Sequence, residues 1–166
     1  MEISIIAAVT LNNVIGLNGK MPWLIKNDLK RFKELTMGNC VIMGRKTFFS
    51  LSKALDGRKN IVLTNNKNLV LPNCSIANSV DEAINLCNSF NKVFIIGGNS
   101  VFSAFLNLTN KIYLTKIYAN IKGDTFMPEI NYNDWQLIEQ EDFNDDKYSD
   151  YPYSFLTFIK KTNLYI

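Results

Sequence analysis

The stretch that decides the fold runs from residue 93 to residue 100 and reads Val93-Phe94-Ile95-Ile96-Gly97-Gly98-Asn99-Ser100. Its unbroken run of β-branched and aromatic residues is typical of a strand buried on both faces. The two glycines allow a tight turn, and apolar residues at 101, 102 and 105 then repeat at helical spacing. A buried strand that leads straight into a helix predicts an α/β fold with a parallel sheet.

The same alternation extends outward from this stretch in both directions. Strand patterns lie at 3–9, 40–43, 60–63, 75–77 and 111–118. Helical patterns lie at 29–35, from about 47 onward, and at 79–90, where Ser79 and Glu82 form a capping box. The tail differs, because 135–141 and 154–160 alternate as an antiparallel pair with an aspartate-rich connection, expected to be a solvated loop. We predict one α/β domain over residues 1–166, with a mostly parallel sheet of about eight strands, flanking helices and a C-terminal antiparallel hairpin.

Composition narrows the possible functions. The 166 residues carry a net charge of +3 without a clustered basic face, which argues against a nucleic-acid partner. The absence of histidine excludes Ser-His and Cys-His nucleophilic sites and histidine-bound zinc. The 3 cysteines lack Cys-x-x-Cys spacing, and no segment approaches the ~20 apolar residues of a membrane span. We expect a cytoplasmic monomer without a metal, acting on a small molecule.

Polar residues follow three of the expected strands at the point where each strand ends. They are Gly44-Arg45-Lys46-Thr47, Thr64-Asn65 after Leu63, and Gly97-Gly98-Asn99-Ser100. Taken singly, each has a plain structural explanation as a tight turn or a solvated helix start, and the Gly-x-Gly-x-x-Gly pattern is absent. Cations at a helix N-terminus oppose the macrodipole by roughly 0.3 to 1 kcal/mol each, which an anionic ligand would offset. Together the three ends favour a phosphorylated dinucleotide in the crevice beyond the sheet.

Asp28 stands on an apolar face of the expected 29–35 helix pattern. Spacings of four and seven place it beside Phe32 and Leu35, so burial is expected to raise the pKa of its carboxyl while a cationic ligand edge lowers it. The alternative is a simple helix-capping aspartate. Because Asn27 can serve as the cap, we take Asp28 as the candidate catalytic carboxylate.

Two nearby features permit both structural and functional explanations. Met21-Pro22-Trp23 is explained by core packing, although the polar Gly16–Met21 segment in front of it can act as a lid. Arg58 precedes a strand, where a surface cation is ordinary, yet a fixed guanidinium there can bind a substrate carboxylate.

Taken together, these motifs resemble the dihydrofolate reductase family over essentially the whole chain. The matching segments, in order, are Ile15-Gly16, Met21-Pro22-Trp23, Asp28-Leu29-x-x-Phe32-Lys33, Val41-Ile42-Met43-Gly44-Arg45-x-Thr47, Gly57-Arg58-Lys59-Asn60-Ile61, Ile96-Gly97-Gly98, Tyr113-Leu114-Thr115 and Gly123-Asp124-Thr125. The resemblance implies NADPH-dependent reduction of 7,8-dihydrofolate to 5,6,7,8-tetrahydrofolate, with hydride transfer to C6 and protonation at N5. It also implies a cis peptide between the two glycines at 97 and 98.

The resemblance further implies a role for each matching residue. Asp28 would bind the pterin 2-amino group and N3 and help to protonate N5, Thr115 would hold that carboxylate, and Trp23, with Met21 beside it, would order a water. Arg58 would bind the glutamate α-carboxylate. The implied pocket for the rest of the substrate consists of Ile6, Ala8, Leu29, Phe32, Leu51, Leu55 and Ile96. The implied cofactor site consists of Ala8, Ile15, Gly16, Gly44, Arg45, Lys46, Thr47, Leu63, Thr64, Asn65, Gly97, Gly98, Asn99, Ser100, Val101, Phe102 and Thr125.

Two other functions remain open at this level. A related pterin or pyrimidine reductase of the same fold would not require the pair Asp28 and Thr115, or an arginine at Arg58. A nucleotide-binding module without catalysis is the second, because Phe102 stands where a tyrosine is common in the family.

Overall fold

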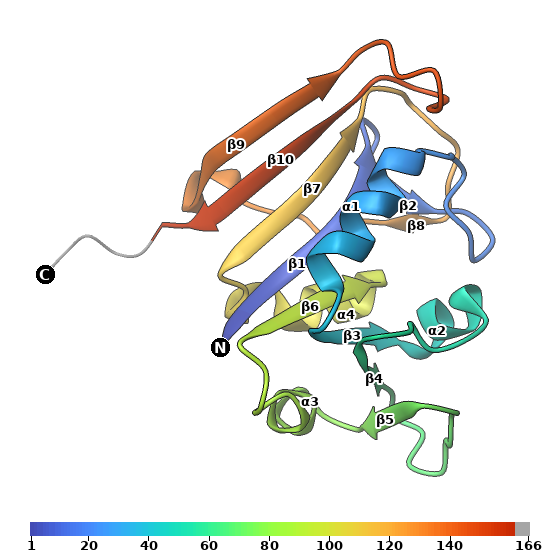
Figure 1. Ribbon diagram of the computed structural model, residues 1–166, viewed down its shortest axis with the longest axis vertical. Coiled ribbons are helices and arrows are strands. Elements are labelled where there is room, and N and C mark those ends of the chain that lie inside the picture. The colour runs from blue at the N-terminus through green and yellow to red at the C-terminus, as the bar shows by residue number, and fades with distance from the viewer. Residues whose placement is uncertain (162–166) are drawn as a thin grey trace, which may run out of the picture.

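The computed structural model describes residues 1–161 and places one large sheet at the centre of the molecule (Figure 1). Eight strands follow the spatial order β5-β4-β3-β6-β1-β7-β10-β9. From one edge to the other they are β5 (Cys74–Ala77), β4 (Lys59–Leu63), β3 (Cys40–Gly44), β6 (Lys92–Gly97), β1 (Glu2–Thr10), β7 (Lys111–Ile117), β10 (Tyr153–Lys160) and β9 (Trp135–Phe143). Neighbours from β5 to β7 are parallel, whereas β10 is antiparallel to both β7 and β9. The predicted fold class, including the C-terminal hairpin, is confirmed.

Helices cover both faces of this sheet because both faces are apolar. Alternate residues along β3 show the pattern, since Cys40 and Ile42 join one apolar cluster while Val41 and Met43 join another. The cluster with Cys40 is covered by α3 (Val80–Leu86) and α4 (Asn99–Phe105), with the 3₁₀ turn Leu106–Leu108 after α4. The opposite cluster is covered by α1 (Lys26–Thr36) and α2 (Arg45–Leu51). The site described below lies on this second face.

Several local expectations need correction. Helix α2 begins at Arg45, directly after β3, rather than near Thr47. A small second sheet, β2 (Val14–Gly16) with β8 (Thr125–Phe126), was not predicted, because strands this short show no readable periodicity. A 3₁₀ turn at Tyr132–Asp134 precedes β9. The extent of the domain to residue 166 stays a prediction, since residues 162–166 lie outside the described part.

Sheet register brings the three polar strand ends together. Gly44 at the end of β3 pairs with Leu63 at the end of β4, and Met43 pairs with Gly97 at the end of β6. These three carboxyl ends therefore meet at one edge of the sheet, where ligands of open α/β sheets collect. Within residues 1–161, no helix is long and apolar enough to cross a membrane.

Candidate active site

Asp28 and Thr115 form the centre of the candidate site. Asp28 lies in the first turn of α1, and its Oδ1 accepts a hydrogen bond of 2.6 Å from the hydroxyl of Thr115, which is buried on β7. Burial raises the pKa of the Asp28 carboxyl, while the Thr115 hydrogen bond and the Arg31 cation partly oppose that increase. A half-desolvated carboxylate with a raised pKa is suited to holding and delivering a proton.

A cavity of about 120 Å³ opens beside this carboxylate. Its lining consists of Met21, Trp23, Leu24, Ile25, Asp28 and Leu29. Trp23 Nε1 is buried and, within residues 1–161, is the only such side-chain nitrogen or oxygen without a hydrogen-bond partner. A buried indole N–H needs an acceptor, which a polar ligand or a water beside Asp28 can provide. The cavity is smaller than the roughly 300 Å³ of typical ligand pockets, so it accounts only for the part of the site around Asp28.

Leu24 and Ile25 line this cavity, although sequence reasoning did not single them out. They directly precede α1, and Leu24 is four residues before Asp28 while Ile25 is four before Leu29. This spacing was a usable signal, because residues four apart around a helix start lie on the same side.

The expected capping role of Asn27 is wrong. The N-cap position is Ile25, which has extended backbone and makes no side-chain cap, so Asn27 lies inside the first turn. Its Nδ2 instead donates a hydrogen bond of 3.1 Å to the hydroxyl of Tyr153 on β10. Neither Asn27 nor Asp28 is the N-cap residue of α1. The bond between Asp28 and Thr115 is a tertiary contact rather than a helix cap.

Arg31, one turn after Asp28, is a cation whose charge lowers the pKa of the carboxyl. Its guanidinium lies 4.4 Å from the ring centroid of Phe155 and 5.6 Å from that of Tyr113. Nη2 also donates a hydrogen bond of 3.3 Å to Thr157 Oγ1. These contacts hold a half-buried positive charge on the sheet side of α1, where it favours the ionised form of Asp28.

Replacing Arg31 with methionine should raise the pKa of Asp28 further. The change removes a charge that lowers this pKa and keeps most of the apolar stem, so burial then acts with only Thr115 opposing it. Carbon-13 NMR titration of the Asp28 carboxyl measures the shift directly. The matched control is Lys30→Met, which removes an exposed cation on the solvent side of the same helix. An Asp28 titration that moves equally in both variants would argue against a specific Arg31 effect.

Four of the predicted substrate-lining residues lie around one apolar cluster. Ile6, Leu51, Leu55 and Ile96 are all half-buried and pack on the cluster that α1 and α2 cover. Phe32 is also half-buried, Ala8 packs on a separate cluster with Trp23, and Leu29 is 45% exposed. Partly exposed apolar side chains at a cluster rim can contact an aromatic ligand without rearranging the core.

Arg58 is held in place at the far end of α1. Its Nε donates a hydrogen bond of 2.9 Å to the backbone oxygen of Asp56, and Nη1 donates one of 3.2 Å to Thr36 Oγ1. Thr36 is buried and donates in turn to the backbone oxygen of Phe32 at 2.7 Å. The guanidinium is thus oriented by two bonds while its other N–H groups can still bind a carboxylate.

Glycines shape the edge where the cofactor is expected. Gly97 has φ +123°, a conformation that side-chain-bearing residues rarely adopt, and the cis peptide implied between Gly97 and Gly98 is present. A Cβ at either position would lie 3.6 or 3.8 Å from Thr47 Oγ1, and one at Gly44 would lie 3.1 Å from Val101 Cγ2. Gly44, Gly97 and Gly98 therefore leave the backbone and the Thr47 hydroxyl accessible, as phosphate binding requires.

The remaining predicted cofactor residues fall into three groups. Arg45, Lys46, Asn65 and Ser100 are exposed, and Leu63 and Thr64 are half-buried at the end of β4. Val101 and Phe102 are buried and pack against Gly44 and Gly97, respectively. Asn99 is exposed, but its Nδ2 donates to the backbone oxygen of Phe126 at 2.7 Å, which ties α4 to β8.

The small sheet anchors the Gly16–Met21 segment. The Asn18 N–H donates to Asp124 Oδ2 at 2.9 Å, and the Asp124 N–H donates to the backbone oxygen of Gly16 at 3.0 Å. Gly16 also lies beside Thr125, since a Cβ on it would be 3.5 Å from Thr125 Cβ. Ile15, in the same strand, packs on the core. The expected lid is therefore tied to β8 in this conformation.

Comparison with known proteins decides the family. A family model described as dihydrofolate reductase matches residues 2–160. The chain belongs to the dihydrofolate reductase family. It is 39% identical to the dihydrofolate reductase of Staphylococcus haemolyticus, covering 93% of each chain. It is also 39% identical to that of Haemophilus influenzae, covering 97% of this chain and all of the relative.

A solved structure of the family agrees with the fold described above. The dihydrofolate reductase of Enterococcus faecalis, complexed with NADP(H) and RAB-propyl, superimposes with a TM-score of 0.92. The two chains are 31% identical and the match covers 97% of each. In this member of the dihydrofolate reductase family, Asp28 lies on α1, and the strand ends lined by glycine lie on the large sheet that α1 covers. Among residues 1–161, no group of three or more His, Cys, Asp or Glu side chains is arranged to hold a metal.

Proposed function

We infer that this chain reduces 7,8-dihydrofolate to 5,6,7,8-tetrahydrofolate with NADPH, by hydride transfer to C6 and protonation at N5. The observation that carries this inference is the Asp28 carboxylate, half-desolvated beside an apolar cavity and oriented by Thr115. Membership of the dihydrofolate reductase family supports it. So does the bound NADP(H) in the Enterococcus faecalis relative.

Asp28 is proposed to bind the pterin through its 2-amino group and N3, since these are adjacent donors that a carboxylate can accept. Because burial raises its pKa, this carboxyl takes up a proton more readily than an ordinary aspartate does, which favours protonation at N5. Thr115 fixes the direction of the carboxylate. The unpartnered Trp23 indole, with Met21 on the same cavity wall, holds a polar group beside Asp28.

The rest of the substrate is proposed to lie along the apolar rim of the α1–α2 face. Ile6 and Ile96 would contact its rings from the sheet, and Leu51 and Leu55 would contact them from the end of α2 and the segment after it, since all four are half-buried. Arg58 would bind the glutamate α-carboxylate through N–H groups that Asp56 and Thr36 leave available.

The glycine-lined edge fits NADPH, which supplies a hydride when bound. Gly44, Gly97 and Gly98 allow its phosphates to approach the backbone, and Thr47 offers a hydroxyl there. Arg45 and Lys46 add positive charge at the start of α2, suited to a 2′-phosphate. Ile15 and Gly16 would border the nicotinamide, near the lid that Asp124 holds.

We further propose that the protein acts as a cytoplasmic monomer on small molecules rather than on nucleic acid. The mild net charge of +3 supports the choice of partner. Cys40, Cys74 and Cys87 are all free thiols, which suits a reducing compartment.

The decisive test follows the loss of NADPH absorbance after dihydrofolate is added to the purified protein. We expect oxidation that depends on both compounds. Omitting dihydrofolate, or replacing it with a pyrimidine substrate of related reductases, is expected to leave NADPH unchanged. Oxidation with the pyrimidine alone would assign the chain to the related reductases, and NADPH binding without oxidation would indicate a non-catalytic nucleotide-binding module.

A further inference from the structure

The segment that connects β9 and β10 forms backbone and side-chain contacts with the residues just before α1, the helix that carries Asp28. Ile25 forms an isolated antiparallel bridge with Ser149. The Leu24 N–H also donates a hydrogen bond of 3.0 Å to Asp150 Oδ2. The connection expected to be a solvated loop therefore makes tertiary contacts, because its aspartates accept from groups outside the loop. These contacts fix the backbone just before α1 but do not reach into its first turn.

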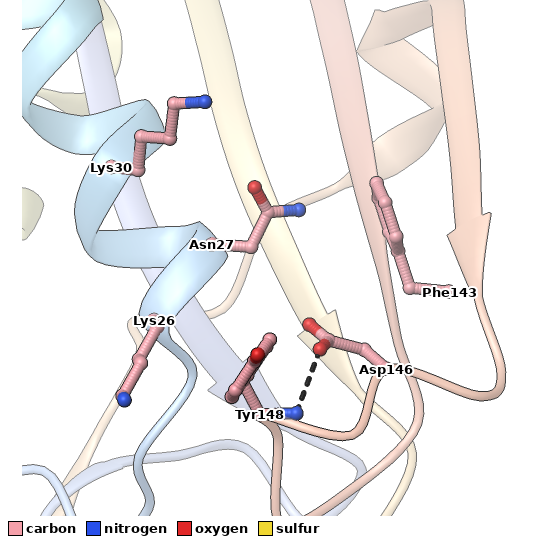
Figure 2. A pocket seen from close by; sticks show the side chains of 6 residues that line it. All are labelled: Lys26, Asn27, Lys30, Phe143, Asp146 and Tyr148. Atoms are coloured by element: carbon pink, nitrogen blue, oxygen red, sulfur yellow. Dashed lines mark hydrogen bonds between the residues drawn. The ribbon is translucent and has the colours of Figure 1, made fainter.

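A hydrogen-bonded chain does reach into the first turn. Asn27 Nδ2 donates to the Tyr153 hydroxyl at 3.1 Å, and that hydroxyl donates to Asp146 Oδ2 at 2.6 Å. Asp146 Oδ1 accepts from the Tyr148 N–H at 2.9 Å. Figure 2 shows Asn27 projecting from α1 toward the side of a groove of about 390 Å³ that carries Asp146 and Phe143. The connection between β9 and β10 is thus bonded to the residue next to Asp28.

Tyr153 is the rigid member of this chain. Its side chain is fully buried and stacks on Phe143, with the ring centroids 4.8 Å apart. Burial and the Asp146 carboxylate raise the pKa of Tyr153 to about 12, so the hydroxyl keeps its proton at neutral pH. The same bond lowers the pKa of Asp146, which remains an acceptor. The direction of donation is therefore fixed, from Asn27 to Tyr153 to Asp146.

The first turn of α1 needs such a support. Ile25, at the N-cap, makes no side-chain cap bond. The N–H groups of Asp28 and Leu29 both donate to the Ile25 backbone oxygen, at 3.1 and 3.3 Å. Helix starts without a side-chain cap fray readily. Fraying at this point would move Asp28 away from Thr115.

We propose that Tyr153 is a positioning residue: by joining Asp146 to Asn27, it holds the first turn of α1 so that the Asp28 carboxylate stays directed at Thr115 and the cavity. The expected effect of Tyr153 on catalysis rests on the function inferred above, whereas its expected effect on the first turn of α1 is independent of that function. Tyr153 touches neither substrate nor cofactor in this assignment. It acts through Asn27 and the backbone of the turn.

The experiment compares Tyr153→Phe, Asp146→Ala, the double variant and Asp146→Asn. Single-turnover hydride transfer should slow about tenfold in each of the first two, the loss expected for one hydrogen bond to a charged group. The double variant should lose no more than either single one, because all three break the same chain. Asp146→Asn should recover part of the rate, since its one amide oxygen can still accept from Tyr153 but leaves the Tyr148 N–H without an acceptor. NADPH binding should stay unchanged in all four.

Tyr118→Phe is the matched control. Its hydroxyl donates to Ser154 Oγ at 2.9 Å, so the variant also removes a hydroxyl bonded to β10, but one without a link to Asn27. We expect it to keep the parent rate. A Tyr153→Phe rate equal to that of Tyr118→Phe would overturn the proposal, as would losses that multiply in the double variant or an Asp146→Asn rate as low as that of Asp146→Ala.

Amide hydrogen exchange gives a readout independent of activity. The amides of Asp28 and Leu29 should exchange faster in Tyr153→Phe and Asp146→Ala than any general loss of stability explains, with β7 amides serving as the reference. If the parent protein fails to oxidise NADPH, the inferred function fails and exchange alone decides the positioning role. Unchanged exchange at these two amides would refute that role even in an active enzyme.

Discussion

Replacing Asp28 with asparagine is expected to lower kcat by roughly 10²- to 10⁴-fold at neutral pH, the range that general acid catalysis contributes. Asparagine keeps the shape of the side chain and an oxygen that accepts from Thr115, but it cannot hold a proton. Steady-state kinetics with NADPH and dihydrofolate measure the loss. Activity should recover as the pH falls, because dihydrofolate then arrives already protonated. A variant with the parent kcat at neutral pH would remove Asp28 from the chemistry.

The same substitution has an opposite effect on stability. The pKa of Asp28 is raised above its ordinary 3.8 in the folded state, so the folded protein binds the proton more tightly than the unfolded chain. Stability from this group is present below 3.8 and is lost as pH rises through the raised value. The asparagine variant should therefore be more stable than the parent at neutral pH, with the difference disappearing in acid. Urea midpoints at the two pH values test the sign.

Replacing Arg58 with leucine should raise the KM for dihydrofolate by roughly 10- to 100-fold, as expected for loss of a charge-assisted bond of about 1.5 to 3 kcal/mol. The kcat should change little, since Arg58 lies at the other end of α1 from Asp28 and its proposed contact with the glutamate tail would be the same in the ground and transition states. Steady-state kinetics separate the two constants.

A substrate without the glutamate tail supplies the control for Arg58. Parent and Arg58→Leu should then show the same KM, because the carboxylate that the guanidinium binds is missing. A variant that loses affinity equally for both substrates would indicate a structural role instead, exerted through the bonds to Asp56 and Thr36.

Sequence patterns predicted the large sheet because its parallel strands are buried on both faces. Runs such as residues 93–96 are long, continuous and bounded by glycine or polar residues, so they stand out without any knowledge of partners. Strands β2 and β8 were not predicted, because they contain only 3 and 2 residues and form by pairing between distant parts of the chain. The half-buried position of Asp28 on α1 was predictable for a similar reason, since its apolar helix neighbours lie within seven residues.

The contacts around Asp28 show where sequence reasoning stops. Asn27 beside a helix start favours a capping role, but the start lies two residues earlier and the side chain meets Tyr153 instead. Asp146 and Asp150 lie in a segment whose composition is typical of a solvated loop. Asp146 nevertheless accepts a hydrogen bond from Tyr153, and Asp150 accepts one from Leu24, more than a hundred residues earlier in the sequence. Such pairings depend on how the hairpin folds over α1, which local composition does not encode.

Helix α1 rests on the last strand of the sheet to be synthesised. Asn27 bonds to Tyr153, and Arg31 contacts Phe155 and Thr157, all on β10. On a ribosome, a nascent chain that has emerged only as far as β7 carries both Asp28 and Thr115, but it lacks the β10 side chains that contact Asn27 and Arg31. The candidate site is therefore completed only once β10 has been synthesised, and chains truncated before residue 153 are expected to show no dihydrofolate-dependent oxidation of NADPH.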